Sequence, residues 1–281
     1  MMWQRPGDWS FARAIRSVPV LATEASAMAT AFPLLFARQE GAQAGTLELV
    51  ALLRLGDGGT SPFVGADGRW RAAQIPPLLQ LYPFSLAPVA GGRFGLVVDE
   101  SSGLLSHEPG HGDALFLEDG VPGPELARVI AQFEQRAAAA GITSRAIAAL
   151  EAEGLLTQWH PPGHEATEEA SQEKLFTVDP AKLQALSGDA MARLHSAHAA
   201  GLAYVQIVSM HHIPWLQKAM AVNNSKPART TPAAFGVNDA TTAPADAFLT
   251  ALSTAQFDEM QDVAGQFLME LPAEETQQET C

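Results

Sequence analysis

The sequence predicts an α+β fold: a mostly antiparallel or mixed N-terminal sheet, then a helix-rich half, with one appended C-terminal amphipathic helix. Three observations support this prediction. Short apolar runs bounded by glycine and proline fill the chain up to about residue 120. Apolar residues then recur at helical spacing from residue 124 onward. A polar stretch rich in Pro, Thr and Ala follows residue 222 and precedes a last apolar stripe.

The N-terminal strands are predicted from apolar runs that lie between turn signals. Thr23 is a candidate N-cap for a short helix that extends to Ala31, and Pro33 stops this helix. Residues 46–55 do not alternate cleanly between apolar and polar, which favours a strand buried on both faces. The other strands are expected at residues 18–21, 33–36, 94–99 and 115–117.

The first helices are predicted from apolar spacing after Pro124, which suits the first turn of a helix. We expect one helix over residues 124–140, ended by Gly141, and a second helix that is capped by Thr143 and ended by Gly154. The first of these carries an i, i+3, i+4, i+7 stripe made of Leu126, Val129, Ile130 and Phe133.

Further helices are expected in the last third of the predicted domain. A helical stretch begins at residues 177–180 and is broken by Gly201. A long apolar helix then covers residues 203–219 and is interrupted at Pro214.

The chain divides into three parts by composition. Residues 1–222 form the α+β domain, residues 223–246 a flexible linker, and residues 247–281 an amphipathic helix with an acidic tail. The last helix is a partner-binding candidate, which either folds back onto its own domain or docks on a partner or a second protomer. Its apolar stripe consists of Phe257, Met260, Val263, Phe267 and Leu268.

Charge and cysteine content exclude several classes of protein. The 281 residues include 31 acidic and 17 basic side chains, for a net charge of −14, which argues against binding the phosphate backbone of a nucleic acid. The single cysteine, Cys281, allows no disulfide within the chain and no cysteine-based zinc site.

The sequence predicts neither a membrane span nor a signal peptide. No apolar run approaches the roughly 18 residues that a spanning helix needs. Charged residues interrupt the N-terminal apolar runs, so no signal-peptide core is formed. We therefore expect a soluble cytoplasmic protein, with association to a cell surface as an alternative. The interrupting residues are Arg5, Asp8, Arg13 and Arg16.

Several segments resemble the SapC family of bacterial proteins over about residues 9–220. The most specific is a turn with Gly68-Arg69-Trp70, followed by Ile75-Pro76 and by Tyr82-Pro83-Phe84. Weaker matches are Ala31-Phe32-Pro33-Leu34-Leu35-Phe36, Gly112-Asp113-Ala114-Leu115-Phe116 and Phe176-Thr177-Val178-Asp179.

The resemblance implies a soluble protein of one α+β domain, and the family name comes from an association with surface-layer proteins. Members tend to be encoded near tryptophan-halogenase-like and cupin-like proteins, which are therefore candidate partners. No agreed catalytic residues come with the family. The aromatic residues Trp70, Tyr82 and Phe84 are either ordinary core residues or the lining of a ligand groove.

One enzymatic hypothesis starts from His111 and Asp113, since a His-x-Asp pair with a distant histidine can form the facial triad of non-heme iron oxygenases. His164 would supply the third ligand, and Lys174 could bind the carboxylate of 2-oxoglutarate. The two helices expected between these positions argue against the jelly roll that such enzymes use.

Helical histidine pairs give a weaker metal hypothesis. His195 and His198 are three residues apart on a predicted helix, followed by His211 and His212 on the next one, but no carboxylate is placed beside them. The sequence therefore predicts no catalytic residue, metal or cofactor outright.

Three functions follow from these patterns. The first is a soluble accessory protein that binds a protein or peptide partner and catalyses no reaction. The alternatives are a metal-dependent oxygenase and a structural protein of a surface layer. A homo-oligomer is compatible with each of them.

Overall fold

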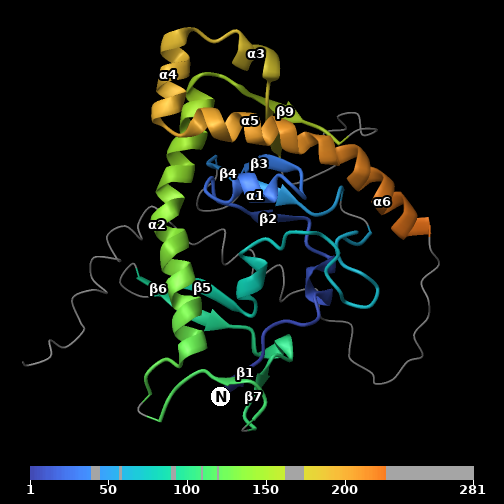
Figure 1. The fold of residues 1–281 in the computed structure, drawn as a ribbon, viewed down its shortest axis with the longest axis vertical. Helices are drawn as coiled ribbons and strands as arrows, with labels where there is room; N and C mark the ends of the chain where they lie inside the picture. The colour runs from blue at the N-terminus through green and yellow to red at the C-terminus, as the bar shows by residue number, and fades with distance from the viewer. Residues whose placement is uncertain are drawn as a thin grey trace, which may run out of the picture.

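An antiparallel five-stranded sheet lies at the centre of the fold in the computed structural model, which describes residues 1–38, 45–56, 59–89, 93–108, 110–118, 120–161 and 174–225. The helices follow the N-terminal strands, which confirms the predicted α+β class (Figure 1). The strand order is β2-β4-β3-β10-β9. Their bounds are Ser17–Pro19, Leu47–Leu52, Leu34–Arg38, Leu175–Val178 and Leu156–Trp159.

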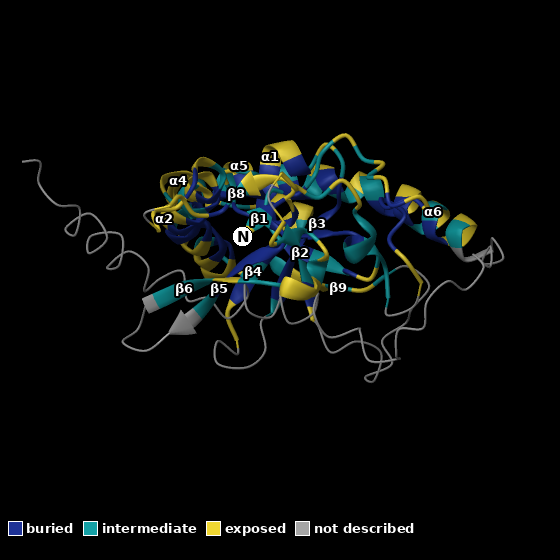
Figure 2. Cartoon of the chain, turned by 90° about the horizontal axis from the view of Figure 1, so that it is seen from below, coloured by how far each residue is buried: buried dark blue, intermediate teal, exposed yellow. Residues whose placement is uncertain are grey.

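The central strands β3 and β4 are buried along almost their whole length. A strand covered on both faces has no solvent side, so its residues need not alternate between apolar and polar. This burial explains why apolar and polar residues do not alternate cleanly at residues 46–55, and the strand expected there is confirmed. Figure 2 shows the buried residues gathered around this sheet and under the helices.

Two smaller sheets complete the β part. The strands β5, Phe84–Val89, and β6, Arg93–Val98, pair with each other. The strand β1, Met2–Trp3, lies between β7, Leu105–Ser106, and β8, Asp113–Ala114. Gly112 has a φ of +102°, and a Cβ atom there would lie 2.2 Å from the carbonyl oxygen of Trp3. Glycine is therefore required where β8 approaches β1.

A single helix, α2, covers Pro124–Ala152 where the sequence predicted two (Figure 1). Gly141 does not end the helix but lies buried inside it, and Thr143 is not a cap. The hydroxyl of Thr143 instead accepts a hydrogen bond from the N–H of Ala22 at 2.9 Å. An internal glycine costs a helix only about 1 kcal/mol, which the packing of α2 against β4 and α5 offsets.

The short elements correct several other expectations. The helix α1, Ala25–Met28, begins after Glu24 rather than after Thr23. Residues 175–178 form the strand β10, and the helix α3, Pro180–Gln184, starts only after Asp179. The Asp179 carboxylate accepts the N–H groups of the two residues after Pro180, so it ends the strand and caps the helix.

The last helices are α4, Gly188–Ser196, α5, Ala199–Ser209, and α6, Ile213–Ser225. The break between α4 and α5 lies at His198, which has a φ of 58°, and not at Gly201, which lies in the first turn of α5. Pro214 does not interrupt a helix, since it lies in the first turn of α6, where no N–H partner is needed. The predicted linker and C-terminal helix fall largely outside the described residues.

Helix α5 is fixed to the sheet by side-chain hydrogen bonds. The strands β3 and β10 pair at two positions, and beyond these the buried side chain of Gln206 lies between them. Its Nε2 donates to the carbonyl of Leu34 at 2.9 Å, and its Oε1 accepts the N–H of Val178 at 3.0 Å. The hydroxyl of Ser209 accepts the N–H of Leu34 at 2.9 Å. The side chains of α5 thus complete the strand pairing.

An exposed ion-pair group holds the N-terminal segment to the start of α2. The carboxylate of Glu125 lies 2.5 Å from Arg5 and 2.5 Å from Arg128. The hydrogen bond from Arg5 is the main cause of a lowered pKa for Glu125.

Within the described residues, no helix has the length and hydropathy that a membrane crossing requires.

Candidate functional site

The three aromatic candidates lie in or against the core. Phe84 and Tyr82 are buried, and Trp70 is half-buried. The hydroxyl of Tyr82 donates to Asp99 at 2.9 Å, and burial is the main cause of the raised pKa of this phenol. The indole N–H of Trp70 donates to the carbonyl of Gln74 at 2.6 Å.

The structure brings two of these candidates into one aromatic cluster. Trp9 contacts Trp70 edge-on, with ring centroids 5.6 Å apart, and Phe11 stacks on Tyr82 at 4.1 Å. Trp9 and Phe11 contact each other at 5.8 Å and so join the two pairs. Phe84 lies apart from this cluster, with Trp3 edge-on at 5.0 Å.

The structure does not assemble the residues of the oxygenase hypothesis. His111 and Asp113 are exposed, and the described neighbour of the His111 ring is Glu108, at 3.6 Å. Asp113 pairs with Trp3 in the small sheet, and His164 lies outside the described residues. In the part of the chain that is described, no three His, Cys, Asp or Glu side chains gather as metal ligands.

The remaining predicted residues are dispersed. Lys174 is exposed beside β10, and His195 and His198 are exposed at the end of α4. The ring of His212 lies within hydrogen-bond distance of the carbonyl of Ala29, at 3.0 Å. The apolar stripe of Phe257, Met260, Val263, Phe267 and Leu268 lies outside the described residues.

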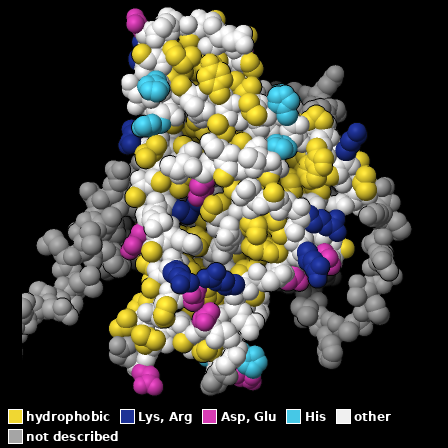
Figure 3. Space-filling model, in the orientation of Figure 1, with side chains coloured by type: hydrophobic (Ala, Val, Ile, Leu, Met, Phe, Trp, Pro, Cys, Tyr) yellow, Lys and Arg dark blue, Asp and Glu magenta, His cyan; other side chains and the backbone are white. Residues whose placement is uncertain are grey.

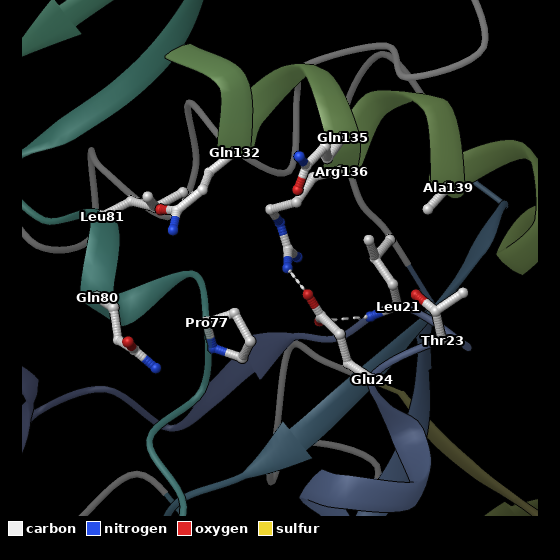
Figure 4. Close-up of a pocket in the computed structure, with 10 residues that line it drawn as sticks. All are labelled: Leu21, Thr23, Glu24, Pro77, Gln80, Leu81, Gln132, Gln135, Arg136 and Ala139. Carbon is white, nitrogen blue, oxygen red and sulfur yellow. Dashed lines mark hydrogen bonds and ion pairs between the residues drawn. The ribbon is translucent and has the colours of Figure 1, made fainter. Parts of the chain in front are cut away.

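A pocket of about 280 Å³ lies in the described part of the chain and is taken as the candidate site. It lies between α2, the turn that precedes α1, and the segment around the 3₁₀ turn Leu79–Leu81 (Figure 4). It includes none of the three aromatic candidates. Its lining residues are Leu21, Thr23, Glu24, Pro77, Gln80, Leu81, Gln132, Gln135, Arg136 and Ala139.

The floor of the pocket is an ion pair between Glu24 and Arg136, whose side chains point toward one another (Figure 4). The side chain of Arg136 is 8% exposed and that of Glu24 is 17% exposed. Burial is the main cause of a lowered pKa for Arg136, and the charge of Glu24 opposes this shift. The carboxylate of Glu24 also accepts the N–H of Leu21 at 3.0 Å.

The surroundings of Arg136 offer its guanidinium fewer hydrogen-bond acceptors than it has N–H donors. Its Nε is buried with no hydrogen-bond partner, and its Nη2 reaches the carbonyl of Pro19 only at 3.4 Å. A buried donor that lacks an acceptor is costly. Because this Nε has almost no exposed surface, a ligand carbonyl would meet the guanidinium through the 8% of the side chain that stays exposed. The adjacent Glu24 supplies an acceptor for a ligand N–H.

Three amide side chains and four apolar residues surround this floor. Gln132 and Gln135 come from α2, and Gln80 comes from the opposite side, where its Nε2 donates to the carbonyl of Ile75 at 3.0 Å. Each amide can donate and accept a hydrogen bond. The apolar part of the wall consists of Leu21, Pro77, Leu81 and Ala139.

The sequence analysis missed this pocket, because its parts come from three distant segments. Glu24 and Arg136 are 112 residues apart, so no local motif joins them. The available signal was a row of polar residues at helical spacing beside the apolar stripe of α2, at Gln132, Gln135 and Arg136. Pro77, on the facing wall, directly follows the Ile75-Pro76 pair of the family resemblance.

The fold and the site together define an α+β domain in which a long helix closes a polar pocket beside an antiparallel sheet. The chain belongs to the SapC family, whose family model matches residues 1–216. This match confirms the membership that the Trp70, Ile75-Pro76 and Tyr82-Pro83-Phe84 segments predicted. No curated protein and no solved structure matches the chain.

Proposed function

We propose that this SapC-family protein is an accessory protein that binds a peptide segment of a partner in the pocket and catalyses no reaction itself. The observation that carries the proposal is the floor of the pocket, where Arg136 and Glu24 present donors and an acceptor side by side. A peptide group offers the complementary pair, because its C=O accepts and its N–H donates.

The ligand class follows from charge and size. An anionic ligand would meet the carboxylate of Glu24 and the net charge of −14, so a neutral amide fits better than a carboxylate or phosphate. A volume of about 280 Å³ is at the lower end of the range for ligand pockets. It suits one or two residues of a peptide, with an apolar side chain against Leu21, Pro77 and Leu81.

Tryptophan-halogenase-like and cupin-like proteins are the candidate partners that the family resemblance implies, and we place the interaction in the cytoplasm. Overlapping synthetic peptides that cover such a protein from the same genome are a direct probe. A library of random peptides displayed on phage is a second, unbiased probe.

The test compares two phenylalanine variants of the same helix. Ala139 lies on the pocket wall, whereas Ala138 is exposed and does not line the pocket. Fluorescence anisotropy would measure the affinity of the selected peptides for each variant. We expect Ala139→Phe to weaken binding by about tenfold or more, which corresponds to about 1.4 kcal/mol, and Ala138→Phe to leave it unchanged. Equal binding by both variants, or no peptide selected at all, would overturn the proposal.

A further inference from the structure

The outer side of α5 and α6 carries a row of exposed apolar residues. Tyr204, Val208, Trp215 and Val222 are 52%, 62%, 49% and 55% exposed. A 3₁₀ turn, Met210–His212, joins α5 to α6, and the spacing of the four residues places them on one side of this helical run. Figure 3 shows hydrophobic side chains gathered on this face with histidines among them. We call this row the outer face. A row of large apolar side chains of this extent is typical of an interaction surface.

The opposite side of the same helices already packs on the domain. Leu202, Gln206, Ile213 and Leu216 are buried there, so the outer face cannot turn inward without exposing them. The ring of Trp215 also contacts the buried Phe63 of the domain, with centroids 5.2 Å apart, and about half of Trp215 stays exposed. The outer face is therefore open to an occupant from elsewhere.

We propose that residues 248–268 of the same chain dock as a helix on the outer face. The chain continues directly from the end of α6, the element that carries half of this face. Large apolar residues in this segment include Phe248, Leu252, Phe257, Met260, Val263, Phe267 and Leu268. The five from Phe257 to Leu268 fall within an arc of about 140° at helical spacing, so a helix there would present one apolar side.

The lengths of the two surfaces agree. From Tyr204 to Val222 a helix rises about 27 Å, and residues 248–268 as a helix would measure about 30 Å. The spacer at residues 226–247 can extend to about 70 Å at most, which is ample for either direction of docking. The connection also makes docking intramolecular, which raises the effective concentration of the segment to the millimolar range.

The charges are complementary as well. Residues 199–225 contain no Asp or Glu, and they carry Lys218 with His211 and His212. Residues 248–281 contain no Lys, Arg or His, and their acidic residues include Asp258, Glu259, Asp262 and Glu270. A chain with an overall net charge of −14 thus keeps its outer face free of acidic side chains, which favours an acidic helix over a basic one as the occupant.

Hydrogen–deuterium exchange of the full-length chain tests the proposal. We expect the amides of residues 248–268 to exchange at least about tenfold more slowly than an unstructured chain. Two substitutions on opposite sides of the contact, Val208→Asp and Phe267→Asp, should each remove this protection. Thr276→Asp, which adds the same charge beyond the docked segment, should keep it. Because Val208 is 62% exposed, its replacement leaves the core intact.

Three results would overturn the proposal. The first is fast exchange of residues 248–268 in the unmodified chain. The second is protection that Phe267→Asp removes but Val208→Asp does not, which would place the segment on another surface. The third is protection that appears only at concentrations where sedimentation shows a dimer, which would make a second copy the occupant. Peptide binding in the pocket is measured independently, so neither proposal depends on the other.

Discussion

Removing one partner of the Glu24–Arg136 ion pair should destabilise the protein far more than removing both. In Glu24→Leu, the guanidinium stays 8% exposed and keeps only the 3.4 Å contact to Pro19. An uncompensated buried charge costs about 3–5 kcal/mol, and we expect about 4 kcal/mol here. In Arg136→Met, the carboxylate stays 17% exposed and retains the N–H of Leu21, so we expect about 3 kcal/mol.

The double variant, Glu24→Leu with Arg136→Met, decides whether the two side chains act as a coupled pair. Replacing both charges with apolar side chains leaves no buried charge, and the remaining loss is the acceptor of the Leu21 N–H, which costs about 1–2 kcal/mol. The two single effects sum to about 7 kcal/mol, so the coupling energy between Glu24 and Arg136 should reach about 5 kcal/mol.

Urea unfolding followed by far-UV circular dichroism measures these differences, and Arg128→Met is the control on the same helix. Arg128 pairs with Glu125 at the surface, where its side chain is 66% exposed, so its loss should cost less than about 1 kcal/mol. Additive single effects, or a cost for Glu24→Leu no larger than that of the control, would refute the argument that the pocket floor is a coupled buried pair.

Three further predictions concern the fold. Gly112→Ala should destabilise the protein by more than about 2 kcal/mol in urea unfolding, because the new Cβ would contact a backbone carbonyl. The control Gly110→Ala should cost only about 1 kcal/mol, because Gly110 has a similar φ of +89° but open space around it. Equal losses would show that the close approach is unimportant. Gln206→Leu should cost about 2–4 kcal/mol in the same assay, because it leaves one buried carbonyl and one buried N–H without a hydrogen-bond partner. A loss of stability below about 1 kcal/mol would contradict this. The folded pKa of Glu125 lies below its unfolded value, so its stabilisation is present at neutral pH and is lost as the pH falls through the folded pKa. The thermal midpoint of the wild type should therefore fall more between about pH 7 and pH 3 than that of Glu125→Gln, and parallel curves would contradict the assigned role of Arg5.

Elements whose signal is local were predictable from the sequence. The strand β4 follows from an apolar run that only Glu48 interrupts, and α2 follows from Pro124 and the stripe that comes after it. The prediction that Gly141 ends a helix was wrong. Local preference alone favours a helix end at glycine, but the packing of α2 outweighs that preference.

Features that depend on distant residues were not predictable. The strands β9 and β10 have four residues each, and β10 pairs with β3, more than a hundred residues earlier in the chain. So short a segment carries too little periodicity to separate a strand from the start of a helix. The pocket was missed for the same reason, since Glu24 and Arg136 each read as an ordinary charged residue until the fold brings them together.

The hydrogen bonds from Gln206 and Ser209 to the sheet have a consequence for which changes in chain length α5 can accept. An inserted or deleted residue between Ala199 and Gln206 would turn one part of the helix by about 100° relative to the other. Either the two polar side chains would then leave the strand edges, or Leu202 would leave the core. We therefore expect α5 to keep a constant length, with variation in chain length placed outside Ala199–Ser209.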